Sequence, residues 1–320
     1  MFWNWLWSKN VYIYSYNFIL LNTTQMANLW MIKGKIKSVW NLKKITRALE
    51  VVSTVKLQKI KDKADSQKEY LLDLVHIIST TWSLKTFFDQ DSTNLEEEET
   101  VLNIVITSER WLCGWLNSKL LRKVVTENND KKSDVFVIGK KGLEFFKRTW
   151  SNIVWSLSVS DKYDEKSLLP LYTFFDEAIS TGKYTSIYIY FNYFKNSIMQ
   201  LPTAMQLYPF TSESFDSLLA DLDIKSVTDM DTWDKDLMIE PSLEEFAIEA
   251  RRQLRNFVLS STILQNKAWE HASRMIAMKN AKDNATDLGK KLKQTFNKAR
   301  QGAITQEISE IVSAKIAIWD

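Results

Sequence analysis

The fold is decided by residues 268–317, which read AWEHASRMIAMKNAKDNATDLGKKLKQTFNKARQGAITQEISEIVSAKIA. The stretch contains no proline, and its apolar residues recur at steps of three and four, the spacing of one face of an α-helix. The apolar stripe is narrow, which suits a two-helix seam, so we predict one arm of a coiled coil. The predicted seam residues are Met275, Met278, Ala281, Ala285, Leu288, Leu292, Phe296, Ala299, Ala303, Ile308 and Ile311.

A second stripe of the same kind lies near the other end of the chain, between residues 32 and 78. It contains no proline and no glycine after Gly34, and as one helix it would be about 70 Å long. A compact enzyme domain rarely needs that length, and the two stripes can pair antiparallel. The predicted seam face is Ile32, Ile36, Val39, Leu42, Ile45, Leu49, Val52, Leu57 and Ile60.

Residues 100–210 have a different sequence pattern, in which runs typical of β-strands alternate with runs typical of helices. Strands are predicted at 101–108, 134–139, 152–159 and 184–194, with a last extended piece at 199–210. Helices are predicted through Leu120, through Leu143 and over 167–180. The alternation predicts a mostly parallel sheet with helices on both faces. The fold class is therefore α/β, a Rossmann-like domain joined to a long antiparallel coiled coil of N- and C-terminal helices.

Four motifs carry a resemblance to a known family. They are KITRALEVVSTVKLQK at 44–59, SERWLCGWLN at 108–117, HASRMIAMKNAKDNA at 271–285 and NKARQGAITQEISEIVSA at 297–314. The chain resembles the gamma subunit of F-type ATP synthases, the central stalk rotor, over nearly everything after Met26. The last motif is the most specific, through Ile304, Thr305, Glu307 and Glu310. Ala314 stands where the family usually has glycine, and Leu49 where relatives commonly have methionine.

The resemblance implies a bacterial shaft that couples ion-driven rotation of a membrane ring to ATP synthesis or hydrolysis. Its implied partners are the alpha and beta subunits of the catalytic ring, the epsilon subunit and the membrane c-ring, with no nucleic acid. It implies a peripheral place at the cytoplasmic face of the inner membrane, and no catalytic residue, cofactor or metal on this chain. Contacts with the catalytic ring are implied at Lys44, Arg47, Leu49, Glu50, Arg300, Gln301, Thr305 and Glu307.

Charge gives an independent but weaker indication of a partner. The chain has 320 residues, a net charge of +3 and a pI near 8.6, which is too mild to indicate nucleic acid. Its basic residues nevertheless crowd the two predicted arms, and such a face would attract an acidic partner. The alternative is that these residues only keep exposed helices soluble. They are Lys33, Lys35, Lys37, Lys43, Lys44, Arg47, Lys56, Lys59, Lys61 and Lys63 on the first arm, and Lys290, Lys291, Lys293, Lys298 and Arg300 on the last.

Candidate chemical groups are few. The single cysteine, Cys113, excludes a disulfide framework, and we interpret it as a small packed residue. The two histidines, His76 and His271, have no zinc-site spacing, and we interpret both as helix-surface or seam residues. The loop from Gly139 to Gly142 matches no phosphate-binding motif and predicts an ordinary strand-to-helix turn. Two rival functions stay open, a small-molecule enzyme on a doubly wound domain and a coiled-coil adaptor.

The predicted domain limits follow these patterns. Residues 26–92 form the N-terminal coiled-coil helix, 93–210 the α/β domain, 211–241 an acidic surface segment and 242–320 the C-terminal coiled-coil helix. Residues 93–100 are predicted to be a solvated linker. The helix should restart near Ser242, because Pro241 and early acidic residues suit a first helical turn. Residues 1–25 are predicted to be a spurious extension from an upstream start codon, too short in their apolar run to span a bilayer.

Tryptophan usage is unusual, with 13 Trp against 7 Gly. The family has glycine where Trp111 and Trp115 stand, in a tight turn where a side chain would be strained. We therefore hypothesise that some tryptophans are glycines encoded by a reassigned UGA codon. Trp40, Trp150, Trp155 and Trp269 stand in small-residue or turn-like contexts, and true aromatic packing is the alternative there. The sequence does not decide Trp233 or Trp319.

Peptide mass spectrometry of the natively produced protein tests the recoding. We expect glycine at positions 111 and 115. Tryptophan found at both positions would sink the hypothesis. An N-terminal peptide that begins within residues 1–25 would separately contradict the predicted start.

Overall fold

The computed structural model describes residues 2–81, 87, 100–128, 133–149, 152–160, 165–194, 200–211, 239–240 and 242–319. Side chains are described within these ranges except at 2–27, 79–81, 165, 194, 200 and 317–319. The chain forms two compact units, residues 1–50 with 278–320 and residues 51–277. We call them the coil unit and the sheet unit.

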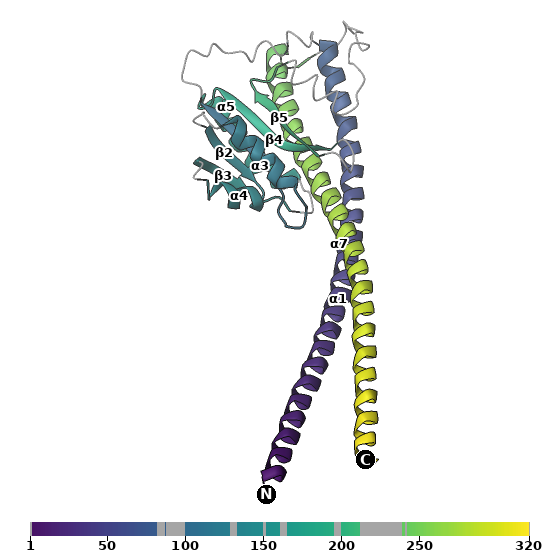
Figure 1. Cartoon of the computed structure of the whole chain (residues 1–320). Helices are drawn as coiled ribbons and strands as arrows, with labels where there is room; N and C mark the ends of the chain where they lie inside the picture. The colour runs from purple at the N-terminus through teal and green to yellow at the C-terminus, as the bar shows by residue number, and fades with distance from the viewer. Residues whose placement is uncertain are drawn as a thin grey trace. The chain divides into compact units, whose positions relative to one another are not determined.

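Two long helices enclose a set of shorter elements in the sequence (Figure 1). In chain order, the elements are α1 (Phe2–Thr81), β1 (Val101–Ile106), α3 (Leu116–Glu127), β2 (Ser133–Ile138), α4 (Lys140–Phe146), β3 (Asn152–Leu157), the 3₁₀-helix η1 (Glu165–Leu168), α5 (Leu169–Ser180), β4 (Ser186–Phe194), β5 (Gln200–Tyr208) and α7 (Leu243–Trp319). Each predicted strand and helix is present. Helix α1 begins at Phe2, whereas the sequence predicted a helix from residue 26. That residues 1–25 are a spurious extension stays a prediction.

The five strands form one sheet in the order β3-β2-β1-β4-β5. Strand β1 pairs parallel with β2 and β4, β2 pairs parallel with β3, and β5 closes the edge antiparallel to β4. The mostly parallel sheet predicted from the sequence is therefore confirmed. The order reverses between β1 and β4, which makes the carboxyl end of β1 the switch point where doubly wound proteins bind ligands.

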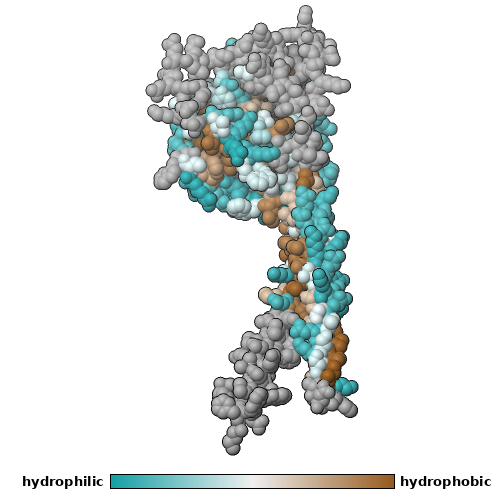
Figure 2. Space-filling view, in the orientation of Figure 1, coloured by the Kyte–Doolittle hydropathy of each residue, from teal (hydrophilic) through white to brown (hydrophobic). Residues whose placement is uncertain are grey.

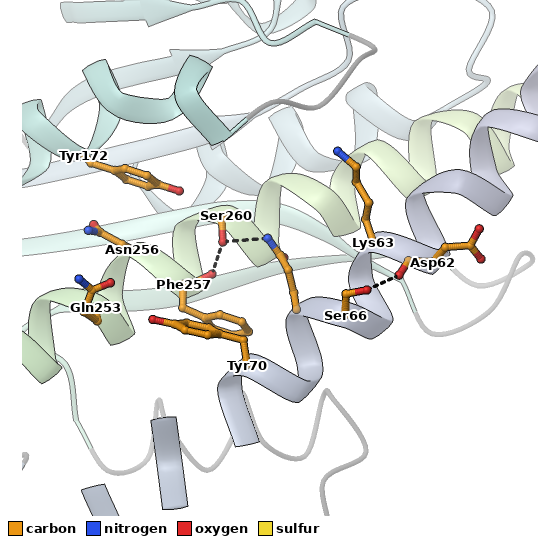
Figure 3. Close-up of a pocket in the computed structure, with 10 residues that line it drawn as sticks. Asp62, Lys63, Ser66, Tyr70, Tyr172, Gln253, Asn256, Phe257 and Ser260 are labelled. Carbon is orange, nitrogen blue, oxygen red and sulfur yellow. Dashed lines mark hydrogen bonds between the residues drawn. The ribbon is translucent and has the colours of Figure 1, made fainter. Parts of the chain in front are cut away.

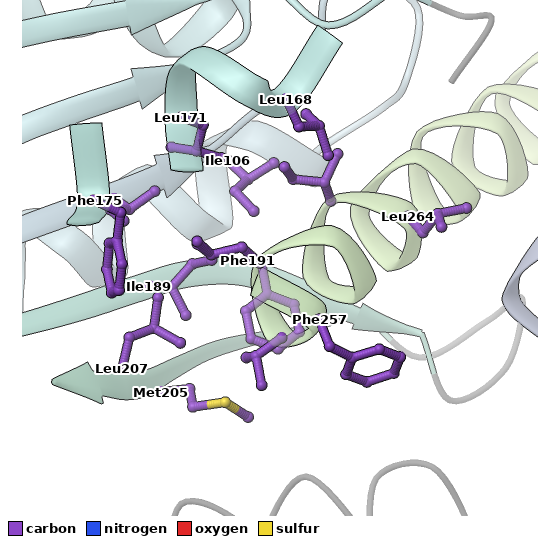
Figure 4. Packing of buried hydrophobic residues seen from close by; sticks show 14 of the residues in the cluster. Ile106, Leu168, Leu171, Phe175, Ile189, Phe191, Met205, Leu207, Phe257 and Leu264 are labelled. Carbon is purple, nitrogen blue, oxygen red and sulfur yellow. The ribbon is translucent and has the colours of Figure 1, made fainter. Parts of the chain in front are cut away.

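Successive side chains of each strand point to opposite faces of the sheet, so the strands contribute to two apolar layers, one on each face. On one face, Val105 and Val137 pack with Leu120 of α3 and Phe146 of α4. On the other face, side chains of the sheet pack with Leu171 and Phe175 of α5 and with residues 247–272 of α7 (Figure 4). Helices thus cover both faces, as predicted.

Helix α7 begins beside Ser242, whose hydroxyl accepts a hydrogen bond from the Glu245 amide at 3.2 Å. Such a cap satisfies an amide that the first helical turn leaves without a partner. Within the sheet unit, α7 buries apolar residues including Leu254, Val258 and Ile263 at 1% exposure or less. The C-terminal helix is therefore a core element of the sheet unit.

A glycine is required where β2 turns into α4. Gly139 has φ of 99°, in the left-handed region, and a Cβ there would lie 2.3 Å from the carbonyl oxygen of Thr107. The Thr107 hydroxyl occupies the start of α4, where it accepts a hydrogen bond from the Gly142 amide at 2.9 Å. The loop is the strand-to-helix turn that the sequence predicted.

The coil unit pairs α1 and α7 antiparallel. Lys282 contacts Glu50, whereas Gly289, further along α7, faces Val39, which is earlier in α1. Seam positions alternate at steps of three and four, as a heptad pattern requires. They are Leu29, Ile32, Ile36, Val39, Lys43, Thr46 and Glu50 on α1, and Met278, Lys282, Ala285, Gly289, Leu292, Phe296, Ala299, Ala303, Gln306 and Glu310 on α7.

Several predicted seam residues are wrong. Leu42, Ile45 and Val52 of α1 are 50–58% exposed, and Leu288, Ile308 and Ile311 of α7 are 49–68% exposed. The seam of α1 instead holds Thr46, which is 4% exposed. Ile32, Ile36 and Val39 lie in the seam as predicted, but from residue 42 onward the seam of α1 passes to the more polar Lys43, Thr46 and Glu50.

Some predictions lie outside the described residues. These are the linker at 93–99, most of the acidic segment at 211–241, and Trp150 and Trp233. The side chain of Trp319 is likewise outside them. The predicted domain limits stay predictions.

Trp269 should be essential to the sheet unit. Its side chain is fully buried, and its indole N–H donates to the Tyr193 carbonyl. The Trp269→Ala substitution should destabilise the protein by about 3–5 kcal/mol, because it leaves a large cavity and removes the hydrogen bond to the Tyr193 carbonyl. Urea denaturation followed by circular dichroism checks this. Trp155→Ala is the control, since Trp155 is 52% exposed and should shift the midpoint little. Equal effects of the two substitutions would contradict the packing role of Trp269.

Candidate functional site: the surface of the coil unit

The predicted contact residues all lie in the coil unit. Lys44 and Arg47 are exposed on α1, Leu49 is half-buried beside the seam, and Glu50 is half-buried in the seam. On α7, the exposed contact residues are Arg300, Gln301, Thr305 and Glu307. The structure therefore places two groups of these residues on the helices of one unit, most of them with their side chains free of the seam.

Glu50 differs from the other predicted contacts because its carboxylate forms an ion pair within the chain. Its carboxylate accepts hydrogen bonds from the Lys282 ammonium, at 3.1 Å to Oε1 and 2.8 Å to Oε2. The two side chains are 20% and 24% exposed. The pair thus links α1 to α7 in a partly buried setting.

Exposed apolar side chains continue along the outside of the coil unit (Figure 2). Towards the end of α7, Ile304, Ile308, Ile311 and Ile316 are 47–68% exposed. Because seam residues such as Ala303 are apolar as well, this part of α7 carries apolar residues on more than its seam. A helix that is hydrophobic on several sides is normally enclosed by other protein. The outer surface of the coil unit is therefore our candidate interface.

The carboxyl end of the sheet holds a group of ionisable residues that the sequence did not suggest. Glu270 is fully buried, with its carboxylate 2.7 Å from Arg274 and 3.7 Å from Lys267. Lys267 also donates to the Val159 carbonyl after β3 at 2.8 Å, while Glu109 after β1 accepts from the Val159 amide at 3.0 Å. These charges pair with one another and with the backbone, so they fasten α7 to the strand ends.

His271 belongs to this buried group, which corrects its interpretation as a helix-surface or seam residue. It is 1% exposed, and its Nδ1 lies 3.3 Å from the Arg274 guanidinium. His76, in contrast, is exposed, as predicted. The sequence missed the group because α7 brings its members to the sheet from far along the chain; their i, i+3 and i+4 spacing at 267, 270, 271 and 274 was the available signal.

Cys113 is a packed residue in the loop after β1. It is 3% exposed, and its thiol lies 3.4 Å from the Ser108 hydroxyl. Burial raises the pKa of the Cys113 thiol, which keeps it protonated and unreactive near neutral pH. The Ser273 hydroxyl of α7 donates a hydrogen bond to the backbone carbonyl of Cys113 at 2.5 Å. The loop is therefore fixed to α7.

The sheet unit also contains an open cleft of about 920 Å³ between α1, α5 and α7 (Figure 3). Its lining is mixed, with amides such as Gln253 and Asn256 and hydroxyls such as Ser66 and Ser260 beside apolar surface. Tyr70 and Phe257 form an aromatic pair there, with ring centroids 6.3 Å apart.

No described helix combines the length and apolarity needed to cross a bilayer. Within the same described ranges, no three His, Cys, Asp or Glu side chains group in a way that suits a metal ion.

Comparison with known proteins decides the family. The family model described as ATP synthase matches residues 28–318. The ATP synthase gamma chain of Buchnera aphidicola subsp. Baizongia pistaciae is 35% identical over 304 residues, which cover 92% of this chain and 99% of that one. The chain belongs to the ATP synthase gamma chain family. The gamma chain of Stenotrophomonas maltophilia strain R551-3 is also 35% identical, over 92% of this chain and 100% of its own length.

Solved structures agree on the fold of this gamma chain family member. A chain of the Euglena gracilis mitochondrial ATP synthase, described as OSCP/F1/c-ring in rotational state 3, matches with a TM-score of 0.63 and 17% identity. The match covers 91% of this chain and 95% of that one. A chain of the central stalk and c-ring from Tetrahymena thermophila matches with a TM-score of 0.52 and 21% identity, over 74% and 99% of the two chains. The resemblance seen in the sequence motifs is confirmed.

The strain argument for recoded glycines is wrong. Trp111 and Trp115 are 70% and 75% exposed, and the positive φ angles of this loop fall on Leu112 at 70° and Gly114 at 61°. Trp115 itself has an ordinary φ of −88°. The side chains point into solvent, and Lys141 lies 3.3 Å from the centroid of the Trp111 ring. Recoding itself stays a prediction, now without conformational support at these two positions.

The Glu270 group should matter for stability. Arg274→Met should destabilise the protein by about 3–5 kcal/mol, because it leaves a buried carboxylate with one less cation. Removing both charges, in Glu270→Gln with Arg274→Met, should recover part of that loss. Urea unfolding measures both. Lys290→Met is the matched control, since its partner Asp287 and Lys290 are 69% and 71% exposed, and it should leave the midpoint unchanged. A double variant less stable than Arg274→Met would contradict the pairing.

Proposed function

We propose that this chain is the central rotor shaft of a bacterial F-type ATP synthase. The single observation that carries the proposal is the match to gamma chains along 92% of this chain. The coil unit supports it, because its outer surface carries exposed apolar side chains. Alpha and beta subunits of the catalytic ring would surround the coil unit. The epsilon subunit and the membrane c-ring would contact the sheet unit. The complex would lie at the cytoplasmic face of the inner membrane, with this chain peripheral.

The mechanism follows from the asymmetry of the two-helix shaft. Two unequal helices present different side chains in different directions, so each angle of the shaft favours different conformations in the subunits around it. A shift of that kind requires differential contact energy between the states. Ion-driven rotation would thereby release ATP, and ATP hydrolysis would drive rotation backwards through the same contacts, because coupling is reciprocal.

The proposed contacts are of two kinds. Lys44, Arg47 and Arg300 are exposed cations that suit acidic loops of a surrounding ring, and long-range attraction tolerates rotation better than fixed pairs. Leu49 and the exposed isoleucines of α7 supply a smooth apolar bearing. Gln301, Thr305 and Glu307 complete the proposed surface, together with Glu50, which pairs with Lys282 of α7.

We propose that the chain has no catalytic site of its own and binds no cofactor. The switch point of the sheet, where a doubly wound enzyme would bind substrate, is filled by Glu270, Arg274 and their neighbours on α7. Paired and buried charges have no access to a substrate. This arrangement favours the rotor over a small-molecule enzyme.

Reconstitution tests the proposal. The chain, mixed with alpha and beta subunits from its own source, should complete an active ATPase. Ile308→Asp should weaken this association by roughly tenfold to a hundredfold, because an isoleucine loses about 1.5–3 kcal/mol of burial. Asn297→Asp is the matched control, since it adds the same charge at an exposed polar position on α7 and should bind normally. Normal assembly of Ile308→Asp would refute the apolar bearing, and failure of the parent chain to assemble would refute the rotor.

A further inference from the structure

The two edges of the sheet differ in what they offer to another strand. Strand β5 contains Pro202, which has no N–H to donate, and the Pro202 carbonyl accepts a hydrogen bond from the Lys123 ammonium at 3.1 Å. Strand β3, at the other edge, contains no proline, glycine or charged residue. Native proteins commonly use proline or charge to keep an edge strand from pairing with other chains. The sequence of β3 has neither of these protections.

Strand β3 is also poorly covered (Figure 1). All six of its residues are exposed or half-buried, whereas all six residues of β1 are buried. Among the described strands, only β2 pairs with β3. A bulge, in which Val154 is the extra residue, interrupts the first half of β3. The regular part of this edge therefore begins at Trp155.

Backbone groups of this regular part point away from the sheet. The Leu157 carbonyl accepts a hydrogen bond from the Gly139 amide at 2.9 Å, on the side of β2. The N–H and C=O groups of successive strand residues point alternately to the two sides of the strand. Ser156 and Ser158 therefore direct their backbone groups outward, where an added strand could pair with them.

The side chains beside this edge are apolar on the face of the sheet that α5 covers. Trp155 is 52% exposed, and its ring centroid lies 6.1 Å from that of Phe174 on α5. Leu157 packs against the same core. A strand added to β3 would place alternate side chains next to Trp155 and Leu157, and aromatic and apolar neighbours of this kind stabilise paired strands. The added strand should therefore be apolar at every second position.

The opposite face is basic beside the same edge. Residues 140–148, which form α4 and the start of the turn into β3, read KKGLEFFKR, with four basic residues and one acidic residue. Helix α4 packs in one apolar cluster with Ile153 of β3, so these charges lie near the edge. Lys140, Lys147 and Arg148 are exposed. The remaining side chains of an added strand would meet these cations, which favours acidic residues there.

We propose that the edge of β3 from Trp155 to Ser158 binds an extended segment of another polypeptide, in which apolar and acidic residues alternate. The backbone of β3 supplies the hydrogen bonds, and the two faces select the side chains. A second copy of this chain is disfavoured, because pairing two β3 strands would bring two basic flanks together. The proposal does not rest on the rotor function, since it uses the sheet unit alone.

The test measures the binding of synthetic eight-residue peptides to the full-length chain by fluorescence anisotropy. One peptide alternates valine and glutamate, and the control peptide alternates valine and lysine. Ser156→Pro removes an outward N–H from β3, and Ser156→Ala is the matched control that keeps it. Lys147→Glu with Arg148→Glu reverses the charge beside the edge, and Lys290→Glu with Lys291→Glu makes the same change at exposed positions of α7. Urea midpoints show whether each variant is folded.

The glutamate peptide should bind, and the lysine peptide should bind at least about tenfold more weakly, because its charges would face cations. Ser156→Pro and the double reversal at Lys147 and Arg148 should each weaken binding of the glutamate peptide by about tenfold. Both control variants should bind it normally. In the unsubstituted chain, the bound peptide should slow hydrogen exchange of the Ser156 and Ser158 amides, a readout that does not depend on how well any variant folds.

Absence of binding by the glutamate peptide, equal binding of the two peptides, or full binding by folded Ser156→Pro would overturn the proposal. A dimer of the parent chain that Ser156→Pro dissociates would also overturn it, because a second copy would then occupy the edge. Unchanged exchange of the Ser156 and Ser158 amides would place the peptide elsewhere, with the same consequence. These readouts use no other ATP synthase subunit, so their outcome is independent of the reconstitution that tests the rotor.

Discussion

The structure depends on one constraint, the continuity of α7 from a packed core into an exposed coil. Its first half is buried in the sheet unit, where Trp269 and Leu254 are core residues. Its second half, from Met278, is one of the two helices of the coil unit. A helix backbone satisfies its own hydrogen bonds along its whole length, so one helix can contribute residues to two very different surroundings. Just before the change, Lys267 and Ser273 donate to the carbonyls of Val159 and Cys113 and so fasten the helix to the loops at the strand ends.

The same constraint explains what happened to the switch point of the sheet. A doubly wound sheet leaves a crevice at the carboxyl ends of its central strands, and enzymes bind ligands there. In this chain α7 crosses the crevice and fills it with charged side chains that pair among themselves. Lys267 holds the loop after β3, and Ser273 holds the loop after β1. The loops at the switch point therefore hold α7 in place, which suits a shaft subunit.

The sequence indicated the elements well and their contacts poorly. Strand and helix periods are local properties, so the five extended segments and the two long helices were recognisable from residue spacing alone. The choice between two stripes that lie about one residue apart is not local. Leu42 and Ile45 were predicted inside because they are hydrophobic, but they are 50% and 58% exposed, and Thr46 on the face that carries Ile36 and Val39 is 4% exposed. The tryptophans show the same limit, since Trp111 and Trp269 stand in similar small-residue contexts but one is 70% exposed and the other fully buried.

By itself the sequence determined the secondary structure, the α/β class and, through its motifs, the gamma chain family. It also placed the candidate contacts Arg47 and Arg300 on the two helices that make the coil unit. Only the tertiary structure decided which face of α1 is covered and that His271 and Glu270 are buried beneath the loops of the sheet. The physical reason is that burial and charge pairing are properties of residues that meet in space. Residue spacing along one helix reports where a face lies, but the partner across the interface decides which face is used.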